Sequence, residues 1–414
     1  MSKYSTIGEK IVGSQIIKLN NLIKSITDKR VYNYTIGDFD PTIHQIPGLL
    51  SENIVSQYEL DNTNYPHSQG ELALRESISK HTKRNGAGYE PDEILVGAGV
   101  RPLIYTMFRT ILDVGDYVLF PVPSWNNDHY SFLSYCNTIP IETKPENKFN
   151  LTPFDVEYNI HKCNLICLCS PQNPTGTVMD KLSLGKICEI ILNKNKELGC
   201  HKKPVYLFLD EIYSELIDDK YNILNDYPDM KEYIISVDGI SKSLCATGVR
   251  VGWMMGSKSF ISQATQIFSH IGAWSPKPEQ RATAKYINNT FDYNSFIDIK
   301  KSIYKRIMKG FISILDKHKD AGFEYVKPDG GIYLSVKIPY RKTTTDLNYF
   351  LSYLVNDCGI GLVPFDYFGT TDSEWFRLSI GSVAYMGNEL NEYLTHFDEV
   401  LTKITNFNKI SRLY

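Results

Sequence analysis

The sequence lacks any long apolar run and carries almost no net charge. No stretch of its 414 residues approaches the roughly 18 consecutive apolar residues that a membrane helix needs, so we predict no membrane partner. Lys plus Arg total 44 and Asp plus Glu total 47, which gives a net charge of −3. This balance gives no electrostatic reason to expect nucleic acid as a partner.

The sequence also lacks the marks of a secreted or metal-binding protein. Its eight cysteines are scattered through apolar segments, without the C-x-x-C or Cys/His spacing that is typical of zinc sites. Polar and charged residues interrupt the first twenty positions, so we expect no secretory signal. Reduced thiols at small core positions are the favoured interpretation. We therefore predict a cytoplasmic protein without a metal site.

Short apolar runs alternate with helical patterns through the first two thirds of the chain. Helical spacing covers 102–112 and 180–198, and strand-like runs occupy 94–97, 117–120, 164–169, 205–209, 233–237 and 251–255. Continuous apolar strands separated by helices indicate a mainly parallel sheet that is covered on both faces. We predict an α/β, three-layer large domain over residues 46–294.

The pattern changes after about residue 295. Helical stretches at 296–319, 347–356 and 387–402 then mix with strand-like runs at 322–326, 331–336, 359–363 and 375–380. This mixture predicts a smaller α+β domain over residues 295–414. Residues 1–45 do not fit the parallel-sheet pattern, and we expect this N-terminal segment to pack on the small domain.

Three of the apolar runs lead into polar clusters. The clusters are 170–176 (Ser-Pro-Gln-Asn-Pro-Thr-Gly), 210–213 (Asp-Glu-Ile-Tyr) and 239–253, which holds Lys242 and Arg250. Ligands of doubly wound sheets bind outside the carboxyl ends of strands, so we expect these clusters to converge. Asp210 could be a helix N-cap or the partner of a cation, and Tyr213 lies one helical turn further on, which lets both face one ligand.

The clusters supply groups that suit one cofactor. Lys242 could be a solvated surface charge, but at the mouth of a buried sheet it can act as a nucleophilic amine. Arg250 and the glycine turn at 97–102 suit a phosphate, because free N–H groups at a helix start bind anions. The turn lacks the G-x-G-x-x-G spacing of dinucleotide sites. A reactive Lys, an Asp for a ring cation and a phosphate site together match pyridoxal 5′-phosphate (PLP).

The same residues resemble a known family. Asn173-Pro-Thr-Gly176, Asp210-Glu-Ile-Tyr213 and Ser241-Lys242 with Arg250 resemble the motifs of the fold-type I, class I/II aminotransferases, and the resemblance covers residues 33–386. It implies Lys242 as the Schiff-base lysine. It further implies that the cofactor contacts Asp210 at its pyridine nitrogen, Asn173 and Tyr213 at its ring oxygen, and Arg250, Ser241, Gly99 and Val100 around its phosphate.

The resemblance extends to the substrate and to a second subunit. Trp125, in Pro-Val-Pro-Ser-Trp, resembles the aromatic residue that stacks on the cofactor ring. Arg377 resembles the arginine that grips the substrate α-carboxylate, beside Asn173, and Gly37 lies in the loop that closes over that carboxylate. Tyr65 resembles a residue that reaches the neighbouring subunit's phosphate. The resemblance therefore implies a homodimer with shared active sites.

Two positions depart from the family pattern. Gly239 stands where many members have a serine that touches the phosphate, so that contact would be lost. Val100 stands where some aspartate-specific relatives carry a lysine for the distal carboxylate, which weakens an aspartate assignment. Arg101 beside it could bind phosphate or a distal acid, or face solvent. The candidate side-chain pocket, Arg101, Trp125, Asn126, Asn127 and Trp274, does not select a substrate.

We predict a PLP-dependent aminotransferase that moves an amino group between an L-amino acid and a 2-oxo acid. The same residues would also serve a C–S β-lyase or a synthase, because these enzymes differ in what lies beyond the substrate Cα. A non-catalytic regulatory domain of this fold is a further alternative, disfavoured because no basic helix-turn-helix segment precedes residue 45.

Overall fold

A computed structural model describes residues 3–11, 13–342, 344–371 and 373–410 of the chain. Its strands are β1 (Tyr32–Asn33), β2 (Ile94–Ala98), β3 (Tyr117–Val122), β4 (Asn137–Glu142), β5 (Leu165–Cys169), β6 (Tyr206–Asp210), β7 (Ile234–Gly239), β8 (Val251–Met255), β9 (Glu324–Val326), β10 (Tyr333–Lys337), β11 (Ile360–Gly361), β12 (Val363–Pro364) and β13 (Trp375–Ser379). Its α-helices are α1 (Thr6–Lys10), α2 (Gln15–Ser25), α3 (Gly48–Glu59), α4 (Leu72–Thr82), α5 (Val100–Ile111), α6 (Asn127–Leu133), α7 (Pro153–Asn159), α8 (Lys181–Leu198), α9 (Ile223–Asp226), α10 (Ile240–Ser243), α11 (Lys258–Ile271), α12 (Lys277–Asn288), α13 (Thr290–Lys317), α14 (Leu347–Asn356) and α15 (Glu389–Ile410).

The central sheet has seven strands in the order β2-β8-β7-β6-β5-β3-β4. The pairs from β7 to β4 are parallel, and only β8 runs antiparallel to its neighbours β2 and β7 among the paired strands described. The prediction of a mainly parallel sheet is therefore confirmed. The sequence reading missed β4, because its side chains are exposed or half-buried and form no apolar run.

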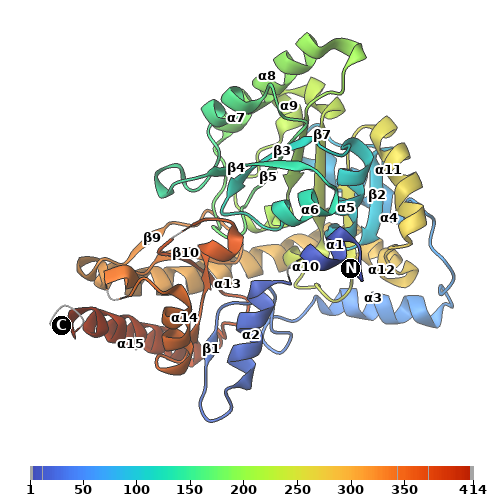
Figure 1. The fold of residues 1–414 in the computed structure, drawn as a ribbon. Coiled ribbons are helices and arrows are strands. Elements are labelled where there is room, and N and C mark those ends of the chain that lie inside the picture. Colours follow the sequence, from blue (N-terminus) through green and yellow to red (C-terminus); the bar gives the residue numbers. More distant parts are fainter. Residues whose placement is uncertain (1–2, 12, 343, 372, 411–414) are drawn as a thin grey trace.

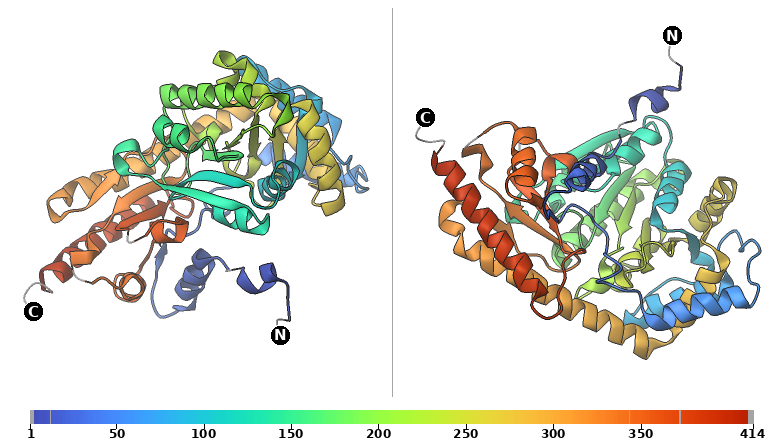
Figure 2. Two further views of the ribbon diagram at one scale, coloured as in Figure 1. Left: turned by 45° about the horizontal axis from the view of Figure 1, so that its top comes forward. Right: turned by 90° about the horizontal axis from the view of Figure 1, so that it is seen from below.

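Alternate residues of the central strands enter two different cores. Leu207 and Leu209 of β6 belong to the core under α3, α4, α7, α8 and α12, whereas Phe208 belongs to the core under α5, α6 and α11. The helices therefore cover both faces of the sheet, as Figures 1 and 2 show. Because successive side chains of a strand point to opposite faces, the position of a residue at a strand end decides which face of the sheet its side chain reaches.

A second sheet, called the small sheet below, has the order β12-β13-β10-β9 and is antiparallel throughout its described pairs. Its core contains side chains of α13, α14 and α15. Helix α14 has the predicted bounds, whereas α13 begins six residues earlier than predicted, at Thr290, and α15 continues to Ile410. The predicted strand at 359–363 is two short strands, β11 and β12.

The 28-residue helix α13 joins the two halves of the molecule. Tyr293 and Ile297 near its start pack in the core of the central sheet, and Phe311 near its end packs in the core of the small sheet. The N-terminal segment lies against the second half, because β1 pairs in parallel with β11. The domain boundaries at 45 and 294 stay predictions.

Over the described ranges, no helix has both the length and the apolar character that a membrane crossing requires. The eight cysteines are all free thiols, and in the same ranges no three His, Cys, Asp or Glu side chains gather in a way that could hold a metal ion.

Candidate active site

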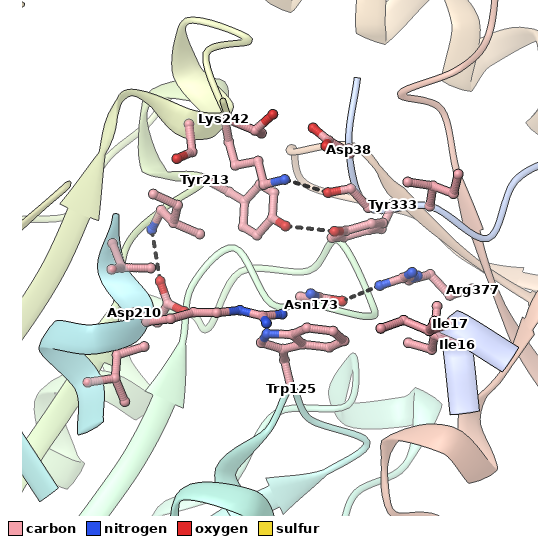
Figure 3. Close-up of a pocket in the computed structure, with 18 of the residues that line it drawn as sticks. Ile16, Ile17, Asp38, Trp125, Asn173, Asp210, Tyr213, Lys242, Tyr333 and Arg377 are labelled. Carbon is pink, nitrogen blue, oxygen red and sulfur yellow. Dashed lines mark hydrogen bonds between the residues drawn. The ribbon is translucent and has the colours of Figure 1, made fainter. Parts of the chain in front are cut away.

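A cavity of about 350 Å³ lies where the ends of the central strands face the small sheet. Eleven of the residues singled out in the sequence line it (Figure 3): Gly37, Val100, Arg101, Trp125, Asn173, Asp210, Tyr213, Ser241, Lys242, Arg250 and Arg377. The three polar clusters therefore converge on one cavity, as predicted from the sequence. Gly99 is not among the lining residues but directly precedes Val100 and lies beside Arg250, whereas Tyr65 lies elsewhere.

Lys242 enters the cavity from the short helix α10, directly after β7. Its Nζ donates a hydrogen bond to the Gly37 carbonyl oxygen. Burial lowers the pKa of Lys242 to about 8; the nearby Asp38 opposes this shift, whereas Arg377 and Arg101 add to it. At mildly alkaline pH a large fraction of this amine is therefore neutral and able to accept a proton.

Asp210 is the last residue of β6 and shares the face of Phe208, so its carboxylate reaches the cavity. Its Oδ1 accepts a hydrogen bond from the Ile212 N–H at 3.1 Å. Burial raises the pKa of Asp210 to about 6, a cost that a cationic partner would relieve.

Tyr213 also lines the cavity, but by a different route from the predicted helical turn. The chain after β6 makes a turn, and a short 3₁₀ helix starts only at Ser214. Its hydroxyl lies 2.7 Å from the hydroxyl of Tyr333, which comes from β10 of the small sheet.

Arg377 lies on β13 and is 1% exposed. Its Nη1 donates to Asn173 Oδ1 at 2.9 Å, and its Nη2 donates to the Thr35 carbonyl at 2.6 Å. The guanidinium carbon lies 4.6 Å from the centre of the Tyr333 ring. Within the described ranges the buried Nε has no hydrogen-bond partner, so the guanidinium keeps one N–H for a ligand.

The start of helix α5 and Arg250 form a cradle at the other end of the cavity. Gly99 precedes the helix with φ +80°, and a Cβ built on it would lie 2.4 Å from Arg250 Nη2. Arg250 donates to the carbonyls of Thr247 and Ala98, both at 2.8 Å. The first N–H groups of a helix have no partner inside it, so this corner suits an anion.

Gly239, the departure noted in the sequence, has a packing reason. A Cβ at this position would lie 2.8 Å from the Val251 carbonyl oxygen and 2.9 Å from Gly252 Cα on the neighbouring strand β8. A serine therefore does not fit here without a shift of β8.

Arg101 and Trp125 form one wall. The Arg101 guanidinium carbon lies 5.2 Å from the centre of a Trp125 ring, and the described structure gives that guanidinium no ion pair or hydrogen bond of its own. The helix α2 covers the opposite side, where Figure 3 shows Ile16 and Ile17 pointing toward the cavity. Sequence reasoning missed Tyr333 and both isoleucines, because each reads as an ordinary apolar residue of a strand or helix.

Tyr65 lies outside this cavity. Its side chain is 84% exposed, and its ring makes an edge-to-face contact with Trp274 at 5.9 Å between centroids. The role that the resemblance implies for it stays a prediction.

A second cavity, of about 400 Å³, lies behind the first, on the opposite face of the sheet. Glu211, the neighbour of Asp210, lines it together with Lys220, Glu215 and Asp238. Lys220 Nζ lies 3.8 Å from Glu211 Oε1 and 4.0 Å from Glu215 Oε1. Burial alone would lower the pKa of Lys220, but these carboxylates raise it above its usual range.

The two partly buried lysines should therefore titrate in opposite directions. In the cofactor-free protein, we expect the rate at which Lys242 reacts with cyanate to rise with a midpoint near pH 8. The Lys220 amine should stay charged, and therefore unreactive, to a higher pH than an ordinary lysine. At pH 8 the neutral fractions differ by about 100-fold or more. Peptide mass spectrometry after short labelling at a series of pH values measures both midpoints in one sample. Equal midpoints would contradict the electrostatic account of the two cavities.

Comparison with known proteins identifies similar proteins over most of the chain. The model of the family "Aminotransferase class I and II" matches residues 42–394. The chain is 32% identical over 357 residues to a probable aspartate/prephenate aminotransferase of Rickettsia typhi, covering 83% of this chain and 84% of that protein. It is 27% identical over 361 residues to an aspartate aminotransferase of Bacillus sp. YM-2, covering 85% and 88%.

The fold is also that of a solved enzyme. The aspartate aminotransferase from Thermus thermophilus with maleate superimposes with a TM-score of 0.84 at 23% identity, over 97% of this chain and all of that one. The fold class predicted from the sequence is confirmed by this likeness and by the mainly parallel sheet. The family match covers most of the chain, and the chain belongs to the class I and II aminotransferases and is an aminotransferase.

Proposed function

We propose that this aminotransferase uses PLP, bound through Lys242, to exchange an amino group between an L-amino acid and a 2-oxo acid. The observation that carries the proposal is the convergence of Lys242, Asp210 and Arg377 on one cavity. Aldehyde, pyridinium and carboxylate are the groups that these three side chains would bind.

The donor set fits PLP. The anion cradle of Gly99, Arg250 and the α5 start suits the phosphate, and a side chain at position 99 would fill that cradle. Asp210, whose carboxylate is held at the cavity with an unrelieved burial cost, suits the pyridine nitrogen. Asn173 and Tyr213 present an amide and a phenol to the same space, and Trp125 offers an aromatic face.

Each side chain then has a defined task. When bound, PLP supplies the electron sink that makes proton loss from the substrate Cα feasible. Lys242, whose amine is neutral at mildly alkaline pH, accepts and returns that proton. Asp210 as a carboxylate keeps the ring nitrogen charged. Arg377 binds the α-carboxylate. Its Nε–H has no partner among the described residues, and the Nη1–H that it donates to Asn173 can be donated to the carboxylate instead.

A half-reaction assay tests this function. Purified holoenzyme mixed with an amino donor should lose the visible absorption of the lysine-linked cofactor and release one equivalent of 2-oxo acid. Lys242→Ala should lower the rate by about 10²-fold to 10⁴-fold or more, because the positioned base is gone. Lys258→Ala is the matched control, since that side chain is 74% exposed on the surface.

The alternatives predict other products. A β-lyase would release ammonium in every turnover without a 2-oxo acid acceptor, and a regulatory domain would give no change in absorption. Either result would contradict the proposal.

We further propose that the amino donor carries a second carboxylate, which Arg101 binds. The Arg101 guanidinium lines the cavity beside Trp125, and its charge reaches Lys242, whose pKa it helps to lower. The relatives are named for aspartate and prephenate, two molecules that each carry two carboxylates. Arg101 directly follows Val100, where the expected lysine is missing, so it could supply the cation from the next position.

Arg101→Gln should therefore lower kcat/KM for aspartate relative to alanine by about 10- to 100-fold, the value of a charged hydrogen bond. Arg109→Gln is the matched control on the same helix α5, where Arg109 bonds the Ser134 carbonyl instead. Steady-state kinetics with both donors measures the ratio. An unchanged ratio would show that Arg101 does not read the substrate side chain.

We propose that the working unit is a cytoplasmic homodimer with shared sites. Large apolar side chains are exposed along α3, the loop after it and the start of α4: Val55 (55%), Tyr58 (47%), Leu60 (64%), Tyr65 (84%) and Leu72 (54%). A second copy would cover such a surface and bring its Tyr65 to the anion cradle. Eight free thiols suit a reducing compartment.

Complementation tests the shared site. Lys242→Ala and Tyr65→Glu are each expected to be inactive, yet co-refolding them 1:1 should restore about a quarter of the wild-type rate, because half of the dimers are mixed and each has one intact site. Lys242→Ala mixed with Asp210→Asn is the control. Each site takes both of these residues from the same subunit, so every site in a mixed dimer still carries one of the two substitutions. Recovery in the control, or none in the test mixture, would contradict a shared site.

A further inference from the structure

Tyr333 lies between groups from the central sheet, the small sheet and the N-terminal segment (Figure 3). Its hydroxyl lies 2.7 Å from the Tyr213 hydroxyl, its ring lies under the Arg377 guanidinium, and a Cβ on Gly37 would lie 2.3 Å from its oxygen. The side chain is 1% exposed, so its hydroxyl cannot turn to bulk water. Its proton must go to a protein or ligand atom.

The cation decides which phenol donates. Arg377 lies 4.6 Å from the Tyr333 ring centre and withdraws electron density from that phenol. The same charge lowers the pKa of both phenols against the larger rise that burial causes, but it is the second-largest cause for Tyr333 and the smallest for Tyr213, whose pKa Tyr333 raises further. The more acidic phenol is the better donor, so Tyr333 donates and Tyr213 accepts.

We infer that Tyr333 is a positioning residue, which donates to the Tyr213 oxygen and thereby leaves the Tyr213 proton for the ring oxygen of the cofactor. The inference rests on the proposed function. Hydrogen bonds in a chain polarise one another, so the Tyr213 O–H becomes a stronger donor when its oxygen accepts a bond. Tyr333 thus links the arginine that holds the substrate to the electronic state of the cofactor.

The pH titration of the lysine-linked cofactor tests this role. A bond to the ring oxygen stabilises its anionic form and disfavours protonation of the neighbouring nitrogen. Tyr333→Phe should therefore raise the spectroscopic midpoint by about half a unit to one unit. The other ionisable groups that act on the two phenols are Arg377, Cys169 and Asp38, and the substitution leaves all three in place.

A double-mutant cycle separates this role from mere packing. Tyr213→Phe should raise the midpoint by more than Tyr333→Phe does, and adding Tyr333→Phe to Tyr213→Phe should change it no further. Tyr340→Phe is the matched control: Tyr340 is 0% exposed and lies in the small-domain core, where its hydroxyl bonds the Ser373 carbonyl. Its midpoint should equal that of the wild type.

Site-specific 3-fluorotyrosine at position 333 keeps the ring and makes the phenol a better donor, so the midpoint should fall. This variant also decides the question if Tyr333→Phe does not fold. An unchanged midpoint in both variants, or an additive shift in the double mutant, would overturn the inference. The absence of any visible cofactor absorption in the wild type would instead overturn the proposed function.

Discussion

The buried Arg377 guanidinium is the constraint on which the site depends. It is 1% exposed and stays charged at any physiological pH, so its N–H groups must find partners inside the protein. The partners come from three segments that are far apart in the sequence. They are the Thr35 carbonyl after β1, Asn173 after β5, and the ring of Tyr333 on β10. Its Nη1 and Nη2 hydrogen bonds therefore form only when both sheets and the N-terminal segment are docked.

Much of the fold follows from apolar runs, because a strand buried on both faces has to be apolar throughout. The runs at 94–97, 164–169 and 251–255 are therefore strands β2, β5 and β8. The direction of β8 leaves no trace in such a run, since an antiparallel strand is buried in the same way. The edge strand β4 lacks a run altogether.

The site could be predicted where a polar residue interrupts an apolar context, as Asp210 and Lys242 do at strand ends. Tyr333 gives no such signal, because it lies between apolar residues of a strand whose alternation already accounts for it. Its role depends on the approach of Tyr213, which is 120 residues away in the chain. Contacts between the two sheets are set by docking, and local patterns carry no record of them.

The alternation of side chains along β6 separates the residues of the two cavities. Asp210 and Glu211 are neighbours, yet one faces the cavity of Lys242 and the other the cavity of Lys220. Both lysines are partly buried. Lys220 lies near two carboxylates that keep it charged, whereas at Lys242 the effect of the one nearby carboxylate, Asp38, is opposed by Arg377 and Arg101. Burial that a single carboxylate does not outweigh lowers the pKa of Lys242 and leaves its amine able to accept a proton at mildly alkaline pH. This is why Lys242, and not Lys220 behind the sheet, is suited to the chemistry.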